Sequence, residues 1–249
     1  MRKKYKNPPV QEALCEIFFS GSAWDNTIPG SFYEGIKKDF PNKAQLKQFG
    51  VELNIAEKER VAKFHDNEDR IQFRKPDGSQ IVQLAKDMLV VNQLQPYPHF
   101  EAWLPVVKSK LDLYLRLATP KMITKIGVRY INRIDIPKAE IRLEDYFNIY
   151  PQLPQGLGEK HGSFMMRLEL PPKHFSHQLV ITFATAPSKQ PESMAFALDL
   201  YNIFSNSLSV ERGAELVTQI ANEGHENIEL AFENSIKENL RLLFQEEKK

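Results

Sequence analysis

Cysteine is almost missing from this sequence. A single residue, Cys15, occurs in a chain of 249, which excludes an internal disulfide and any metal site built from several thiolates. Cys15 lies in the apolar run ALCEIFF, where we expect a small buried hydrophobe. A nucleophilic cysteine would need a cationic, partly exposed setting instead.

Long apolar runs are missing too. No stretch approaches the ~20 residues of a membrane helix. The N-terminal MRKKYK is followed by NPPVQEA, not by the apolar segment of a signal peptide. These absences predict a cytoplasmic protein that does not enter a membrane.

There is no excess of either charge. The 33 basic and 32 acidic side chains leave a net charge of +1, whereas a nucleic-acid-binding protein normally carries a strong basic excess. The basic cluster MRKKYK is expected to be a solvated tail. The 42% hydrophobic and 26% charged content is ordinary for a globular protein.

Familiar catalytic motifs are missing as well. GLGEKHGS lacks the preceding strand and the Gly-Lys-Ser/Thr ending of a phosphate loop, and no Gly-x-Ser-x-Gly elbow occurs. His225 and Glu226 begin a zinc-protease pattern that fails at Glu229, so His225 is expected on a helix face. His174 and His177 are expected to be solvated loop residues. We predict no cofactor and no metal site.

The pattern of apolar residues predicts two series of antiparallel strands, each followed by a long helix. Polar turns are expected at DNED and KPDGS, and Gly224 marks an expected break in the last helix. The expected order is a strand at 10–19, a helix within 27–41, strands at 48–55, 59–66, 70–78 and 79–94, a helix within 97–120, strands at 122–137, 164–171, 177–185 and 194–204, and a helix at 214–244.

This order predicts an α+β fold in which two antiparallel β-sheet units each pack against a long helix. The expected units are residues 1–120 and 121–249, either as separate units or as one compact domain. The matching element order raises the idea of a structural duplication, although the two halves show no clear sequence repeat.

The strand GVRYINRIDIP carries unusual polar residues. Arg129 and Arg133 share one face of it, while Asn132 interrupts the apolar opposite face. In a structural interpretation, which we favour, each guanidinium pairs with a carboxylate on a neighbouring strand, such as Glu169 or Asp199. In a functional interpretation the two guanidiniums, roughly 7 Å apart, bind a carboxylate or a phosphate.

The segment QPYPHFEAW places several aromatic residues where a strand meets a helix. Most are expected to make core or helix-end contacts, and the alternative is an exposed anchor for another protein, formed by Tyr97 and Trp103. A binding site in this chain is therefore expected to draw on Arg129, Arg133, Asn132, Tyr97 and Trp103.

The motifs NPPVQEALCEIFF, VVNQLQPYPHFEAW and GVRYINRIDIP resemble those of a sporadically distributed family of uncharacterised prokaryotic proteins of about this length. The resemblance implies a mobile prokaryotic gene and transfers no catalytic residue. It favours a non-enzymatic protein-binding, adaptor or antitoxin-like component of a defence or mobile genetic module, with a protein partner. The alternative is a hydrolase or nuclease with an unrecognised site around Arg129 and Arg133.

Overall fold

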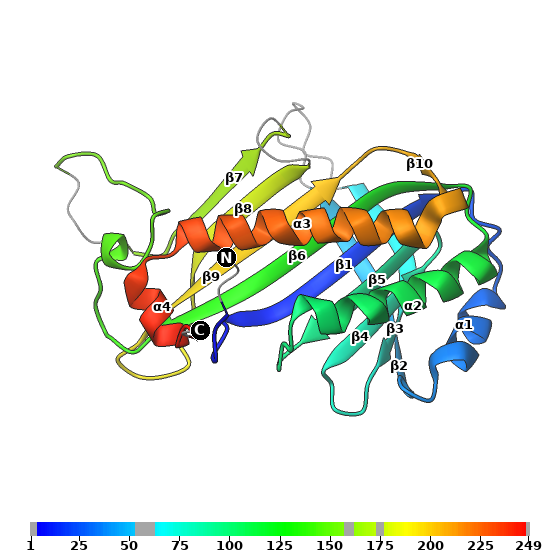
Figure 1. Ribbon diagram of the computed structural model, residues 1–249, viewed down its shortest axis with the longest axis horizontal. Helices are drawn as coiled ribbons and strands as arrows, with labels where there is room; N and C mark the ends of the chain where they lie inside the picture. The colour runs from blue at the N-terminus through cyan, green and yellow to red at the C-terminus, as the bar shows by residue number, and fades with distance from the viewer. Residues whose placement is uncertain (1–3, 53–62, 157–161, 173–176, 248–249) are drawn as a thin grey trace.

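The strands of the protein form one antiparallel sheet. The computed structural model describes residues 4–52, 63–156, 162–172 and 177–247, and within them the sheet has ten strands in the order β2-β3-β4-β5-β1-β6-β9-β8-β7, with β10 paired to β6 (Figure 1). The strands are β1 (Val10–Ser20), β2 (Asn42–Glu52), β3 (Lys63–Arg74), β4 (Gln80–Ala85), β5 (Met88–Leu94), β6 (Met122–Ile136), β7 (Met165–Leu170), β8 (Gln178–Ala186), β9 (Met194–Phe204) and β10 (Leu208–Ser209).

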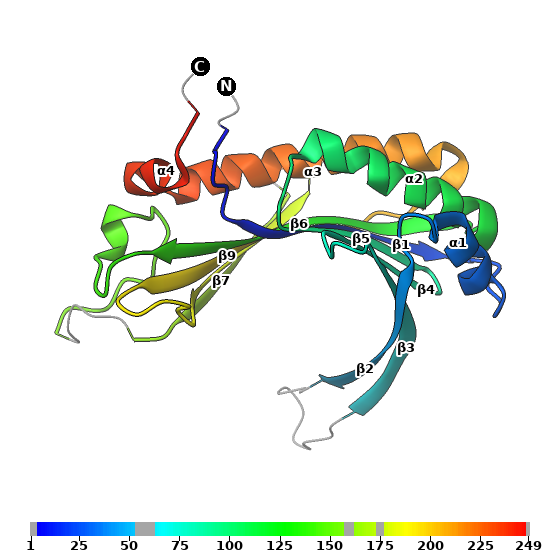
Figure 2. The same ribbon diagram turned by 90° about the horizontal axis from the view of Figure 1, so that it is seen from below.

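All the α-helices of the described chain lie on one face of this sheet (Figure 2). They are α1 (Ile28–Ile36), α2 (Phe100–Ala118), α3 (Gly213–Ser235) and α4 (Glu238–Phe244). No α-helix of the described residues covers the opposite face, which we call the helix-free face. On that side β2 and β3 curve away from the plane of the other strands (Figure 2).

The alternation of side chains along β1 shows why the two faces differ. Ala13, Cys15, Ile17 and Phe19 are buried in the main core together with residues of the helices. Leu14 points the other way and joins a small separate cluster with Ala85, Met88 and Val90. The sequence alternation therefore places the larger apolar set beneath the helices.

One continuous sheet replaces the two expected units. The α+β class is confirmed, but β1 of the first half pairs with β6 of the second half, from Val10 opposite Asn132 to Ser20 opposite Met122. β1 also pairs with β5, so it lies inside the sheet and joins the two halves. The two sheet units and the duplication are not confirmed.

Several element boundaries also differ from the prediction. Residues 66–69, expected as a turn, lie within β3: Asp66 and Asn67 pair with Phe49 and Gln48 of β2, and Glu68 and Asp69 fall in a register shift before pairing resumes at Arg70. The single segment expected at 79–94 is divided by a tight reversal at Asp87, which has a φ of 56°. The last helix passes through Gly224 and breaks at Ile236 instead.

The two ends of the chain lie side by side on the helix-covered side. Tyr5 pairs with Glu246, and the Tyr5 hydroxyl donates a hydrogen bond of 2.7 Å to Glu233 on α3. Burial raises the pKa of Tyr5 above its ordinary value, and the neighbouring Glu233 adds to the rise. The first and last described segments point away from the helix-free face (Figure 2).

Candidate functional site

Arg129 lies at the centre of the helix-free face and binds a carboxylate of the neighbouring strand. Its Nε and Nη2 donate to the two carboxylate oxygens of Asp199 on β9, at 2.8 and 2.5 Å. These hydrogen bonds raise the pKa of Arg129. Asp199 is one of the two partners that the structural interpretation named, and its side chain is 17% exposed.

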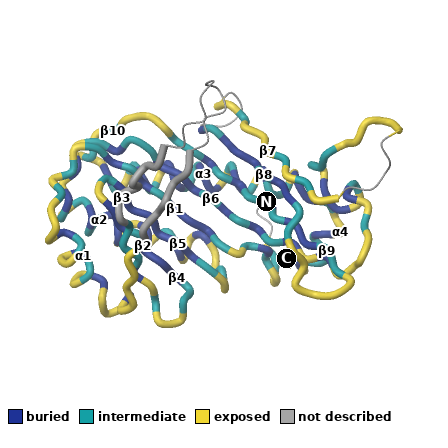
Figure 3. Tube along the Cα trace, turned by 180° about the vertical axis from the view of Figure 1, so that it is seen from behind, coloured by how far each residue is buried: buried dark blue, intermediate teal, exposed yellow. Residues whose placement is uncertain are grey.

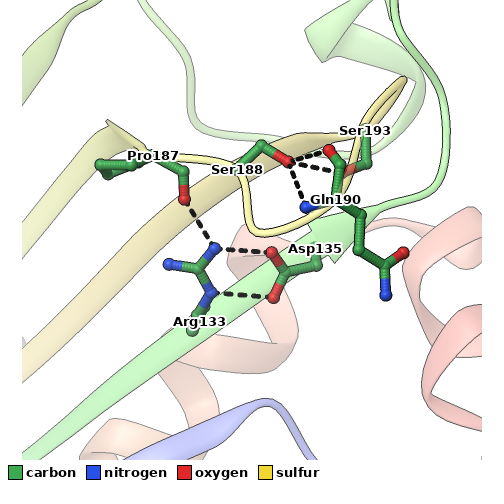
Figure 4. A network of polar contacts seen from close by, with 6 residues as sticks. All are labelled: Arg133, Asp135, Pro187, Ser188, Gln190 and Ser193. Atoms are coloured by element: carbon green, nitrogen blue, oxygen red, sulfur yellow. Dashed lines mark hydrogen bonds and ion pairs between the residues drawn. The ribbon is translucent and has the colours of Figure 1, made fainter.

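Arg133 is held by a different arrangement (Figure 4). Its guanidinium donates to both carboxylate oxygens of Asp135, two residues along the same strand, and to the carbonyl of Pro187 at 2.7 Å. Pro187 belongs to the β8–β9 connection, where Ser188 and Ser193 share a hydrogen bond. Glu169, the other expected partner, pairs with Arg167 instead. The two guanidiniums are thus each engaged by the chain and do not converge on a shared ligand position.

A polar cluster surrounds Gly127 beside Arg129. The Tyr201 hydroxyl donates to the Glu16 carboxylate, and Lys125 Nζ lies 2.6 Å from the same carboxylate. A Cβ at Gly127 would lie 2.6 Å from Cε2 of Tyr201, so only glycine leaves room for the ring. Burial, followed by the charge of Glu16, raises the pKa of Tyr201. The positive charges of Lys125 and Arg129 are therefore balanced at the centre of this face by the carboxylates of Glu16 and Asp199.

The other three expected site residues lie on the helix-covered side. Asn132 is buried and donates to the carbonyl of Leu198 at 3.0 Å, which is a structural role. Trp103 is 1% exposed and lies in the core. This agrees with the expectation of core contacts for this segment and not with the alternative of an exposed anchor. Tyr97 is half-buried, and its hydroxyl lies 2.7 Å from that of Tyr130. The five residues do not form one site.

A buried hydrogen-bonded chain continues from Tyr130 into α3. The Tyr130 hydroxyl lies 3.0 Å from Nδ1 of His225, and Nε2 of His225 lies 3.2 Å from Glu229. The imidazole also stacks on Phe100, with a ring separation of 4.0 Å. Burial raises the pKa of Tyr130 far above its ordinary value, and Tyr97 adds to the rise. His225 is therefore a buried packing residue, which helical spacing alone did not reveal.

His177 is also buried, contrary to the expectation of a solvated loop histidine. It is 4% exposed, and its Nδ1 lies 2.8 Å from Oδ1 of Asn202 on β9. The reason is that His177 directly precedes β8 and points beneath α3, where its Nε2 lies 3.5 Å from Glu223. His174 lies outside the described residues. Cys15 is buried as expected, and burial raises the pKa of its thiol to about 12.

The outer edge of β7 is one of the two unpaired edges of the sheet within the described residues, the other being that of β2. The Thr185 N–H donates to the carbonyl of Phe164 at 3.1 Å, so the backbone of Phe164 points toward β8. Because backbone polar groups alternate in direction along an antiparallel strand, Met165, Arg167 and Glu169 direct their N–H and C=O groups outward. No other strand in the described ranges pairs with this edge.

The side chains of β7 are exposed as well. Met165 is 78% exposed and Leu168 is 40% exposed, both unusual for large apolar residues in this protein. Figure 3, which views the helix-free face, shows exposed positions near β7 and buried or half-buried positions along β1 and β6. Sequence periodicity identified this strand but did not place it at an edge, because strand order depends on pairing between distant residues.

Two surface hollows, of about 390 and 220 Å³, lie near the α3–α4 junction and not beside Arg129 or Arg133. The larger is lined by polar residues that include Asp145, Glu233 and Arg241. Within the described ranges, no group of three or more His, Cys, Asp and Glu side chains is placed to hold a metal ion. Among the helices that the structure describes, none has the length and apolar character needed to cross a membrane.

Comparison of the chain with protein-family models and with the curated proteins found no match.

Proposed function

We propose that this chain is a non-enzymatic protein-binding component, and that it binds by accepting an extended segment of a partner at the outer edge of β7. An adaptor or antitoxin-like role in a prokaryotic defence or mobile genetic module remains part of the proposal. That context is supported only by the resemblance of the sequence motifs, whereas the binding mode is supported by the geometry of β7.

The observation that carries the proposal is the outward direction of the backbone at Met165, Arg167 and Glu169. Each residue offers one donor and one acceptor at an edge with no strand beside it among the described residues. Unpaired edge strands are templates for strand addition. Exposed Met165 and Leu168 provide apolar contacts on the two faces of an added strand.

A hydrolase or nuclease would need Arg129 and Arg133 to face a substrate. Asp199 holds the first guanidinium, and Asp135 with the Pro187 carbonyl holds the second. No observation therefore favours the enzymatic alternative over the binding function.

Arg167→Pro tests strand addition directly. Proline removes the outward N–H at this position and is tolerated on an edge strand whose N–H faces solvent. Arg167→Ala is the matched control, because it removes the side chain and keeps the N–H. Leu168→Pro, whose N–H points toward β8, should lower stability and so verifies the assigned direction of the backbone.

The measurement is capture from a lysate of the native host, followed by hydrogen exchange of the purified complex. We expect the wild type to retain a stoichiometric partner, Arg167→Ala to retain more of it than Arg167→Pro, Arg167→Pro to lose it, and the β7 amides to exchange more slowly in the complex. A partner retained by Arg167→Pro, without protection of the β7 amides, would overturn this binding mode.

A further inference from the structure

The two faces of β7 differ in chemical character from Met166 to Leu170, whereas exposed Met165 shares the face of Arg167 and Glu169. Met166, Leu168 and Leu170 point toward the helix-covered side, and Arg167 and Glu169 point toward the helix-free side. The guanidinium of Arg167 and the carboxylate of Glu169 lie 2.9 Å apart, and both side chains are more than half exposed. An occupant that suits this edge needs an apolar row on one face and complementary charges on the other.

The β7 strand of a second copy meets both requirements. In an antiparallel pair about a two-fold axis at Leu168, each Arg167 lies opposite the partner's Glu169, and each Glu169 lies opposite the partner's Arg167. Leu168 then faces its own counterpart, and Met166 faces the partner's Leu170. Opposite charges and apolar residues are therefore matched at every position from 166 to 170.

The backbone geometry permits this register, and the charges select it. Arg167 and Glu169 both direct their N–H and C=O groups outward, so they can exchange two hydrogen bonds as a closely spaced pair. Moving the axis by one residue to Arg167 would place the two arginines opposite each other, and moving it to Glu169 would oppose the two glutamates. Like charges directly opposite one another are unfavourable, so the axis at Leu168 is preferred.

We propose that a second copy of this chain occupies the β7 edge, with the two sheets continuing into each other across a two-fold axis at Leu168. This inference rests on the proposed function of the edge as an acceptor of a strand, and it names the partner. One strand per copy covers less than the ~1,600 Å² of a standard interface. The dimer should therefore be concentration-dependent in the micromolar range.

Charge reversal provides a specific test by analytical ultracentrifugation. Arg167→Glu and Glu169→Arg should each place two like-charged pairs across the axis, and we expect each variant to dimerise at least ~10-fold more weakly than the wild type. An equimolar mixture of the two variants restores opposite charges in both cross-strand pairs and should recover the association. The double variant Arg167→Glu/Glu169→Arg should recover it as well.

Arg142 and Glu144 provide a matched control, because they form the same kind of exposed ion pair two residues apart away from β7. Arg142→Glu should leave the dimer unchanged, and thermal melts should verify that every variant is folded.

A wild-type monomer at all concentrations would overturn the homodimer but leave the edge open to another protein. A dimer whose affinity does not change in Arg167→Glu or Glu169→Arg must form through another surface. That result would also overturn the homodimer at β7. The proposed function itself would be overturned by two results together: the wild type does not self-associate, and Arg167→Pro retains the captured partner without protection of the β7 amides.

Discussion

The ring of Tyr201 lies over Gly127, and its hydroxyl reaches Glu16 on the far side of β6. Tyr201 belongs to β9 and Glu16 to β1, so the side chain of one strand crosses the strand between them. The position directly beneath the ring can hold no side chain. Three neighbouring strands are therefore linked at the centre of the helix-free face by one hydroxyl and one missing Cβ.

Gly127→Ala should destabilise the protein by about 1–3 kcal/mol, because the added methyl group displaces Tyr201. The cost should become smaller in a Tyr201→Ala background, where the ring no longer occupies the space. Urea unfolding of the four proteins in this cycle measures the coupling. Equal costs in both backgrounds would show that the ring is not the cause.

Arg129→Ala should destabilise the protein more than Arg133→Ala. The first change leaves Asp199, 17% exposed, without its cation, at an expected cost of about 1–3 kcal/mol. The second leaves Asp135, 46% exposed and accessible to water, at about 0.5–1 kcal/mol. Chemical denaturation provides both values, and Asp199→Asn completes a double-mutant cycle for the first pair. The reverse order would contradict the structural assignment of Arg129.

Tyr130→Phe should cost about 1–3 kcal/mol, because it removes the hydroxyl that meets buried His225. Tyr33→Phe is a matched control, since the Tyr33 hydroxyl bonds to the Pro41 carbonyl at an exposed position. We expect a clearly smaller loss there. Thermal and urea unfolding of the two variants compares them, and equal losses would argue against a stabilising role for the buried chain.

Stability should fall as the pH rises above 9, in part through Cys15. The thiol of the unfolded chain loses its proton near its ordinary pKa of 9.0, whereas the native thiol keeps it up to about 12. The unfolded chain therefore binds fewer protons in this window, and the free energy of unfolding decreases with pH. Cys15→Ala should lose less stability than the wild type between pH 8 and 10 in urea titrations. An equal loss in both proteins would assign the effect to other groups, such as Tyr130, whose pKa is also raised.

The strands could be predicted where alternation reflects a single buried face. β1 is such a case, because Ala13, Cys15 and Ile17 all lie beneath the helices. Polarity was misleading at residues 66–69, where pairing with β2 holds an acidic stretch in the extended conformation. The reversal at Asp87 was missed because it interrupts two apolar strands without a glycine or a proline.

The candidate sites depend on strand order, which local patterns do not contain. The requirement that a guanidinium on a strand meets a carboxylate did suggest Asp199 as a partner, without assigning it to Arg129 rather than Arg133. It did not suggest Asp135, which shares a strand with Arg133. The meeting of Tyr201 with Glu16 becomes visible only when β1, β6 and β9 are known to be neighbours. The edge position of β7 becomes visible only when β8 is known to be its one paired neighbour among the described strands.

The interior position of β1 has a consequence for synthesis of the chain. β1 leaves the ribosome before either of the strands that it pairs with, which are Met88–Leu94 and Met122–Ile136. At about 5–20 residues per second, this apolar strand waits on the order of several seconds for each pairing. During that time its apolar surface is available to chaperones and to other nascent chains, so efficient production should depend on protecting this segment until β6 has emerged.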